Sequence, residues 1–217
     1  MDQIVRDALA KWPNVPACTG WLLLDRRGQW RMRDDACQAA GGIGDVIRHD
    51  ALKRFIARNY EADASGRWFF QNGPQRVFVD LAYTPHVVRL HRGGAAHEGD
   101  TPRLVDECGN PFAPAAGWFD DQGNVLFSGT GTNGAATPPT IALLHDHDLA
   151  LFAECLDADL PPDATAHATP DAAVSVSPDG ATMPRAVAWG GGRSLPFAPI
   201  PAAEIAKRFG FVQRPDL

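Results

Sequence analysis

The sequence contains no run approaching the roughly 18 unbroken apolar residues of a membrane-spanning helix. It also has no excess of basic residues, because Lys and Arg number 20 against 26 Asp and Glu, which gives a formal net charge of −6. A negative chain is poorly suited to a phosphate backbone, so nonspecific nucleic-acid binding is disfavoured. The amino terminus lacks the basic-then-apolar layout of a secretion signal. These absences predict a cytoplasmic protein that binds neither a membrane nor nucleic acid.

Cysteine is scarce, and its spacing gives no sign of a metal site. The four cysteines, Cys18, Cys37, Cys108 and Cys155, are far apart and form no Cys-x-x-Cys pair. Zinc sites built on cysteine usually contain such pairs, so the spacing does not support a zinc site made by all four. In a cytoplasmic protein the expected state is four free thiols.

The usual motifs of nucleotide and nucleophile chemistry are missing as well. The stretch GTGTNG (129–134) fits Gly-x-Gly-x-x-Gly, but Pro138 and Pro139 follow, where a dinucleotide site needs the start of a helix. The other glycine clusters lack the Lys-Ser/Thr pair of a phosphate-binding loop, and there is no Gly-x-Ser-x-Gly. We therefore expect no cofactor and assign no catalytic residue.

The sequence does contain an internal similarity. VIRHDALKRF (46–55) aligns without gaps with LLHDHDLALF (143–152), so that Leu52 matches Leu149 and Phe55 matches Phe152. This apolar spacing is typical of one helix face. Upstream, GWLLLDRRGQW (20–30) resembles GWFDDQGNV (117–125), and both contain Asp-x-x-Gly, which is hairpin-turn chemistry. Downstream, residues 69–79 weakly resemble residues 187–197.

The similarity predicts an α+β fold in which two tandem hairpin-helix-hairpin repeats pack together, with a mostly antiparallel sheet. Exposed sheet edges in such a fold could pair to form a homodimer. The expected parts are an N-terminal helix and lead-in (1–19), a first repeat (20–92), a connector (93–116), a second repeat (117–201) with a loop insertion (161–184), and a C-terminal tail (202–217).

The run His145-Asp146-His147-Asp148 is the main candidate for site chemistry. On a helix the two histidines would point to opposite sides, whereas on a strand they would share one face and could hold a metal. The aligned positions in the first repeat are also polar and also precede a helix. An aspartate there accepts hydrogen bonds from free backbone N–H groups. The sequence therefore favours helix capping over metal binding, with His145 and His147 as the metal candidates.

A second candidate surface lies in the first repeat. Trp68 is followed by Phe69 and Phe70, and Arg67 and Arg76 are close by. Aromatic and arginine side chains are enriched where proteins bind partners. We therefore take Arg67, Trp68 and Arg76 as the expected ligand-binding residues.

A series of short motifs runs through the first 90 residues. They are Asp-x-x-Gly-x-Trp, an Ile-led helix start that ends in Phe, a Gly-x-aromatic strand and an Arg-rich hairpin that ends in Pro and apolar residues. These elements fall on Asp25, Gly28, Trp30, Ile47, Phe55, Gly66, Trp68, Arg76, Val77, Pro85 and Val87. In this pattern the chain resembles an uncharacterised proteobacterial family of unknown function. The family implies an α+β fold of repeated motifs and a proposed role in signalling. The chain departs from it at Asp45-Val46, where a proline-containing pair is expected, and in the 161–184 segment.

The function is not fixed by these observations. The favoured hypothesis is a non-catalytic regulatory module that binds a small ligand or a protein partner. Two alternatives stay open: a small metal-dependent hydrolase-like enzyme that uses the His145/His147 region, and a structural module that forms a dimer.

Overall fold

The computed structural model describes most of the chain, namely residues 1–92, 101–131, 139–157, 174–176, 182–184, 186–190 and 193–216. The chain divides into two compact units, which are Met1–Val87 with Glu107–Gly109 and Ala206–Leu217, and Val88–Asp106 with Asn110–Ile205. Most of the expected insertion 161–184 and half of GTGTNG lie outside the described residues. No helix in the described part of the chain is long and apolar enough to cross a membrane.

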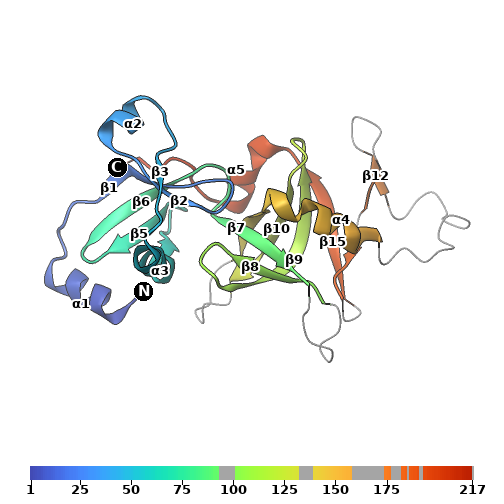
Figure 1. The fold of residues 1–217 in the computed structure, drawn as a ribbon, viewed down its shortest axis with the longest axis horizontal. Helices are drawn as coiled ribbons and strands as arrows, with labels where there is room; N and C mark the ends of the chain where they lie inside the picture. The colour runs from blue at the N-terminus through green and yellow to red at the C-terminus, as the bar shows by residue number, and fades with distance from the viewer. Residues whose placement is uncertain are drawn as a thin grey trace, which may run out of the picture. The chain divides into compact units, whose positions relative to one another are not determined.

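The first unit is built on a six-stranded sheet with the order β3-β2-β1-β6-β5-β4 (Figure 1). Its strands are β1 (Cys18–Leu24), β2 (Trp30–Met32), β3 (Asp45–Val46), β4 (Tyr60–Ala62), β5 (Trp68–Asn72) and β6 (Gln75–Leu81). Its helices are α1 (Gln3–Lys11), α2 (Asp35–Ala39) and α3 (Asp50–Arg58). Strands β1 and β6 pair in parallel, and the remaining neighbours pair antiparallel.

This sheet is strongly curled. Trp30 of β2 and Tyr60 of β4 are four strand positions apart, which in a flat sheet would separate them by about 19 Å. Their ring centroids are nevertheless only 4.9 Å apart. The sheet therefore wraps around its own apolar face, and side chains from distant strands meet inside it.

Helix α3 covers part of that apolar face. It begins after His49, whose Nδ1 accepts a hydrogen bond from the Leu52 backbone N–H at 3.2 Å. Its Ile56 is fully buried, and Phe55 meets Phe70 of β5 edge-to-face with ring centroids 5.3 Å apart. Phe55 and Ile56 of the predicted helix thus face the sheet.

The second unit contains a ring of hydrogen-bonded strands in the order β10-β11-β7-β8-β9, which closes because β9 also pairs with β10. Strands β15 and β14 extend the sheet from β9, and β15 runs parallel to β9. The elements are β7 (His86–His91), β8 (Arg103–Asp106), β9 (Pro111–Asp120), β10 (Val125–Gly131), β11 (Thr140–Leu144), α4 (Leu149–Asp157), β14 (Ala186–Ala188) and β15 (Ser194–Ile200). Strands β12 (Val174–Val176) and β13 (Thr182–Pro184) form a separate hairpin. Helix α5 (Ile205–Phe209) follows β15, and from Ala206 onward it belongs to the first unit.

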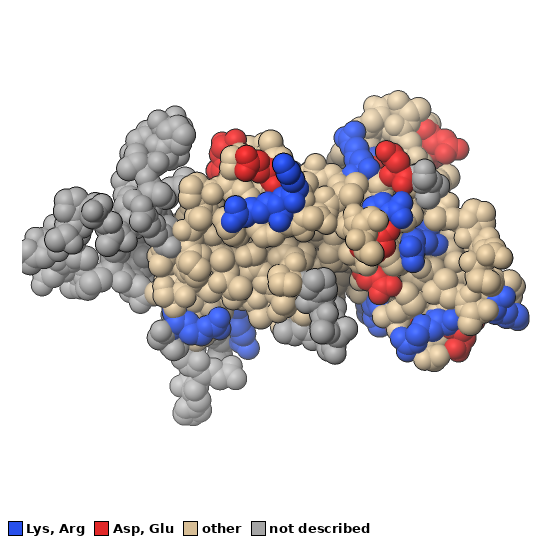
Figure 2. All heavy atoms as spheres, turned by 180° about the vertical axis from the view of Figure 1, so that it is seen from behind, with Lys and Arg blue, Asp and Glu red and all other residues tan. Residues whose placement is uncertain are grey.

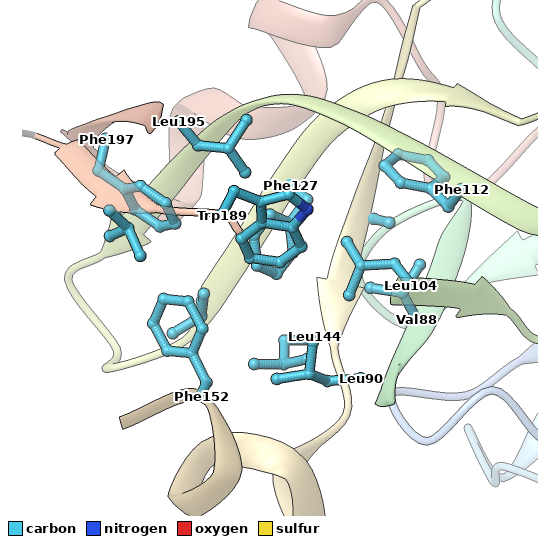
Figure 3. Close-up of a cluster of buried hydrophobic side chains, with 13 residues drawn as sticks. Val88, Leu90, Leu104, Phe112, Phe127, Leu144, Phe152, Trp189, Leu195 and Phe197 are labelled. Atoms are coloured by element: carbon cyan, nitrogen blue, oxygen red, sulfur yellow. The ribbon is translucent and has the colours of Figure 1, made fainter. Parts of the chain in front are cut away.

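The core of the second unit combines aliphatic side chains with a cluster of aromatic rings (Figure 3). Phe127 of β10 is completely buried, and its ring centroid lies 5.2 Å from Trp189 and 5.9 Å from Phe197. Phe152 of α4 packs on the same cluster, with its ring centroid 5.7 Å from that of Phe197. Each buried aromatic side chain removes a large apolar area from water, so this cluster contributes substantially to the stability of the unit.

Four tight turns share the sequence Asp-x-x-Gly, at residues 25–28, 63–66, 106–109 and 120–123. In the last of them, Asp120 Oδ1 accepts hydrogen bonds from the backbone N–H groups of Gln122 (2.9 Å) and Asn124 (2.8 Å). Gly123 has φ +80°, a left-handed conformation that glycine adopts without steric cost. The aspartate thus accepts hydrogen bonds from backbone N–H groups that have no carbonyl partner in the turn, and the glycine allows the chain to reverse its direction.

The strand order of the two sheets agrees over five strands. The order β3-β2-β1-β6-β5 in the first unit corresponds to β11-β10-β9-β15-β14 in the second. In both series the third and fourth strands pair in parallel, as β1 with β6 and as β9 with β15. In the first unit the parallel pair joins the β1–β2 hairpin to the β5–β6 hairpin. In the second unit it joins the β9–β10 hairpin to the β14–β15 hairpin.

The expected fold class is wrong. The chain is mostly β, with two mixed sheets, whereas the sequence predicted an α+β fold of hairpin-helix-hairpin repeats. The described α-helices contain only five or nine residues each, so they cover parts of sheets and form no layer of their own. The prediction gave too much weight to two short helical stripes and did not foresee the parallel strand pairs, which connect residues distant in sequence.

Candidate functional site

The three residues expected to bind a ligand are divided between two faces of the β5–β6 hairpin. Arg67 lies over the Phe78 ring at 4.6 Å, and Arg76 lies over the Phe69 ring at 4.0 Å. Trp68 is buried on the opposite face, because adjacent residues of a strand point to opposite sides of a sheet. The structure therefore brings both arginines near the two phenylalanines and separates them from the tryptophan.

Trp68 belongs to a buried aromatic cluster. Its ring lies 4.8 Å from those of Tyr60 and His86. His86 Nδ1 is 3.0 Å from Glu107 Oε1, and the other Glu107 oxygen accepts a hydrogen bond from the Val87 backbone N–H at 2.9 Å. The Glu107 side chain is only 1% exposed, and a buried carboxylate needs such partners. Trp68 thus packs against a structural histidine–glutamate pair.

On the other face, Arg76, Phe69 and Phe78 form what we call the arginine platform. The two phenylalanines are directly opposite each other in the β5–β6 register, and the Arg76 guanidinium lies 6.0 Å from the Phe78 ring as well. Arg76 is half-buried and makes no ion pair or hydrogen bond within the described residues. Arg67 differs, because Asp63 binds its guanidinium at 2.8 Å and the Asp216 carbonyl accepts a further hydrogen bond.

A second unsatisfied polar group lies beside this platform. Gln71 is opposite Arg76 in the register, and directly opposed residues lie on one face. Its Nε2 donates to the Gly73 carbonyl at 3.0 Å, which fixes the orientation of the amide. The Gln71 Oε1 atom is buried and has no hydrogen-bond partner. Such an atom is unfavourable by about 1–3 kcal/mol until a donor reaches it.

In the second unit, the His-Asp run forms a tight turn between β11 and α4, which we call the histidine turn (residues 145–148). His145 immediately follows β11, and residues 146–148 form one turn of 3-10 helix. The His145 Nδ1 accepts a hydrogen bond from the His147 backbone N–H at 3.1 Å. A histidine ring therefore accepts a capping hydrogen bond here, as His49 does before α3.

Asp148 holds the histidine turn against the neighbouring strand β7. Its carboxylate accepts hydrogen bonds from Arg89 Nε at 2.6 Å and Nη2 at 2.9 Å, and from the Leu90 backbone N–H at 2.9 Å. The His145 backbone N–H also donates to the Val88 carbonyl at 2.9 Å. These bonds fix both ends of the turn, so His145 and Asp148 have defined positions.

The environment of the turn changes the acidity of two of its residues. Burial lowers the pKa of the His145 imidazole, and the nearby Arg89 guanidinium adds to this, against the opposing effect of Asp146 and Asp148. Burial alone would raise the pKa of the Asp148 carboxyl, but its bonds from Arg89 and the Leu90 N–H hold it below the ordinary value. At neutral pH the ring is therefore uncharged and the carboxylate is ionised.

The histidine turn also brings together three side chains that bind metals. Each of His145, Asp146 and His147 offers one ligand atom, and these atoms lie within 4.8 Å of one another. The His145 and His147 rings meet edge-to-face with centroids 4.8 Å apart. Both metal candidates of the sequence are therefore in one place. In the described part of the chain no other group of three His, Cys, Asp or Glu residues has this arrangement.

Surface charge gives no continuous patch of one sign on the described residues that Figure 2 presents, where Lys and Arg are interspersed with Asp and Glu. Several arginines of the first unit are neutralised internally. Arg31 binds Asp25 at 2.5 Å, and Arg33 binds Asp80. The three described cysteines, Cys18, Cys37 and Cys108, form no disulfide with one another, and the Cys155 side chain lies outside the described residues.

Sequence reasoning noted Phe69 but chose Trp68 in its place, and it missed Phe78 and Gln71 at the platform and Arg89 at the histidine turn. Strand alternation could have identified the first group, because Arg76 and Phe78 are two residues apart and must share a face. No local signal points to Arg89, which is 59 residues from Asp148. That pair depends on β7 and β11 being neighbours in the sheet.

The search of curated proteins finds no match for this chain. Two solved structures match parts of the chain. A DUF1285 family protein from Silicibacter pomeroyi DSS-3 is 14% identical with a TM-score of 0.39, over 71% of this chain and 85% of that chain. A DUF1285 family protein from Shewanella baltica OS155 is 12% identical with a TM-score of 0.40, over 62% and 91%. Residues 1–216 match the family model DUF2944, described as a protein of unknown function (DUF2946), so the chain belongs to an uncharacterised family, as its sequence predicted.

Proposed function

We propose that this chain is a non-catalytic regulatory module that binds an anionic ligand at the arginine platform of its first unit. The observation that carries the proposal is the state of Arg76. Its guanidinium is half-buried against Phe69 and Phe78 and has no acidic partner in the described part of the chain. Arg31, Arg33 and other arginines of the same unit have aspartate partners.

A carboxylate or phosphate is the chemistry that fits this group. Arg76 is held by two aromatic rings, so its planar fork of N–H donors is oriented before any ligand arrives. Arginine binds carboxylate and phosphate through two parallel hydrogen bonds, which are stronger than bonds between neutral groups. A ligand hydroxyl that reaches Gln71 Oε1 would also satisfy a buried acceptor that lacks a donor.

The regulatory and signalling parts of the proposal are supported by the resemblance to a proteobacterial family with a proposed signalling role. Binding without chemistry fits the platform, because an arginine over phenylalanine rings can recognise charge and shape. The platform thus suits a regulatory module that responds to whether its ligand is bound.

A ligand screen tests the proposal directly. Purified protein is heated with a panel of mono- and dicarboxylates and phosphate monoesters, and a bound ligand raises the melting temperature by mass action. The affinity of any hit is then measured by calorimetry for the wild type, Arg76→Gln and Arg54→Gln. Arg54 is an exposed arginine of α3 and serves as the matched control.

We expect Arg76→Gln to weaken binding roughly 10- to 100-fold, the equivalent of about 1.5–3 kcal/mol for hydrogen bonds to a charged group. Arg54→Gln should bind like the wild type. The proposal is wrong if no anion shifts the melting temperature of the wild type, or if both variants bind equally well.

A further inference from the structure

The histidine turn of the second unit contains side chains that can bind a metal and that take no part in the arginine platform. We propose that His145, Asp146 and His147 bind one divalent transition-metal ion of the zinc class. The site is independent of the arginine platform, because its residues belong to the other unit. Two nitrogens and one carboxylate oxygen are an accepted ligand set for zinc.

The first argument is convergence. Three consecutive residues place their ligand atoms within 4.8 Å of one another. Asp146 Oδ1 lies 2.9 Å from His145 Nδ1 and 4.0 Å from His147 Nε2. Two ligand atoms of a tetrahedral zinc ion, each about 2.0–2.1 Å from the metal, are roughly 3.3 Å apart. The observed separations lie on either side of that value, so small side-chain rotations bring all three atoms into range.

The second argument concerns the position of the Asp146 carboxylate beside His145 Nδ1. The single lone pair of this nitrogen accepts a hydrogen bond from the His147 backbone N–H. Asp146 Oδ1 lies 2.9 Å from the same nitrogen, so the carboxylate is already within reach of an ion bound there. A cation that takes the lone pair replaces the capping hydrogen bond, and its attraction to the adjacent carboxylate offsets that loss.

The third argument is that the site is ordered on one side and open on the other. His145 is almost buried, and the turn is held to β7 by the Asp148 bonds. Asp146 and His147 have side chains that are 46% and 66% exposed, so an ion can reach them from solvent. Because the inner ligand is already fixed by the fold, binding an ion requires little further ordering of His145.

The local charge permits a cation despite Arg89. The Arg89 guanidinium is paired with the Asp148 carboxylate, so these two groups nearly cancel. Asp146 is the acidic residue among the three ligands, and its carboxylate supplies the negative charge that a cation needs. With three protein ligands, the remaining coordination position of a tetrahedral ion is left to water or to another molecule.

Zinc titration of the metal-free full-length protein tests the proposal, with a chromophoric chelator as competitor. Cobalt(II) substitution gives a second readout, since its visible absorption reports a tetrahedral site with nitrogen and oxygen ligands. The variants are His147→Ala and Asp146→Asn, both at exposed side chains. His91→Ala is the matched control, because His91 is an exposed histidine of the same unit.

We expect one zinc ion per chain, a tetrahedral cobalt spectrum, and a rise in melting temperature on adding zinc. His147→Ala should weaken zinc binding by more than the roughly 10- to 100-fold cost of losing an outer-shell contact, and Asp146→Asn should weaken it as well. His91→Ala and Arg76→Gln should leave it unchanged. Absence of stoichiometric binding by the wild type, or equal affinity of His147→Ala and His91→Ala, would overturn the proposal. Neither result bears on the arginine platform.

Discussion

The Asp148 carboxylate allows a quantitative prediction, because its removal leaves a defined set of groups without partners. It accepts two hydrogen bonds from Arg89 and one from the backbone N–H of Leu90. In Asp148→Ala the Arg89 guanidinium, which is 49% exposed, can turn to solvent. The Leu90 N–H cannot, because Leu90 is part of the buried core.

The magnitude follows from treating the two sides of the carboxylate separately. A buried backbone N–H that loses its acceptor costs about 1–3 kcal/mol. The ion pair with a half-exposed arginine contributes about 1 kcal/mol or less, because solvent screens it. We therefore expect Asp148→Ala to lower the free energy of unfolding by roughly 2–4 kcal/mol. Arg89→Ala, which leaves the Leu90 bond intact, should cost less.

Urea denaturation of the wild type, the two single variants and the double variant measures these differences. A double-mutant cycle isolates the coupling between Arg89 and Asp148. If the two single variants lose equal stability, the Leu90 N–H has found another acceptor and the reasoning fails. A loss below about 1 kcal/mol for Asp148→Ala would refute the claim that this carboxylate anchors the histidine turn.

Three further perturbations test other parts of the structure. Gly117→Ala should destabilise the protein by about 1–3 kcal/mol in urea melts, because its new Cβ would lie 2.0 Å from Phe197 Cζ. Adding Phe197→Leu to the same chain removes this clash and should recover part of the loss. Phe127→Ala, at a fully buried ring, should cost about 3–5 kcal/mol by the same measurement, and a smaller loss would show a core that collapses into the space. The pKa of Asp63 is lowered, since burial raises it but the N–H groups and guanidinium of Arg67 outweigh that effect. The Asp63 carboxylate should therefore contribute its full stabilisation above the unfolded-state pKa of about 3.9 and lose it as the pH falls below that value. The difference in unfolding free energy between wild type and Asp63→Asn should narrow in acid. A constant difference would contradict this.

Local features of the fold were predictable because they depend on neighbouring residues. The Asp-x-x-Gly turns at 25–28 and 120–123 were expected from sequence, and both aspartates accept backbone N–H groups two and four residues later. The same chemistry recurs at 63–66, where the sequence analysis did not identify it. Turn composition was therefore a better guide than the comparison of aligned segments.

Features that depend on distant residues were not predictable from one sequence. The pairing of β1 with β6 places Leu22 beside Val79, and nothing in either segment identifies the other. The apolar stripe of the second helix also differs from the alignment, because Leu149 is 37% exposed while Leu151 packs on the core. The 3-10 turn before α4 has no counterpart before α3, and this difference changes which helix positions face inward.

The internal duplication stays a prediction. The order of the strands bears on it independently of the aligned residues. Short segments can match by chance, but a shared order of five strands with a parallel pair at the same place is a much larger coincidence. The two helix starts agree in one detail and differ in another. His49 and His145 each accept a backbone N–H through Nδ1, and an aspartate follows each of them. Two residues after the capping histidine, the second unit has another histidine, His147, where the first unit has Ala51. The ligand set proposed for a metal therefore exists in the second unit and has no equivalent at the helix start of the first.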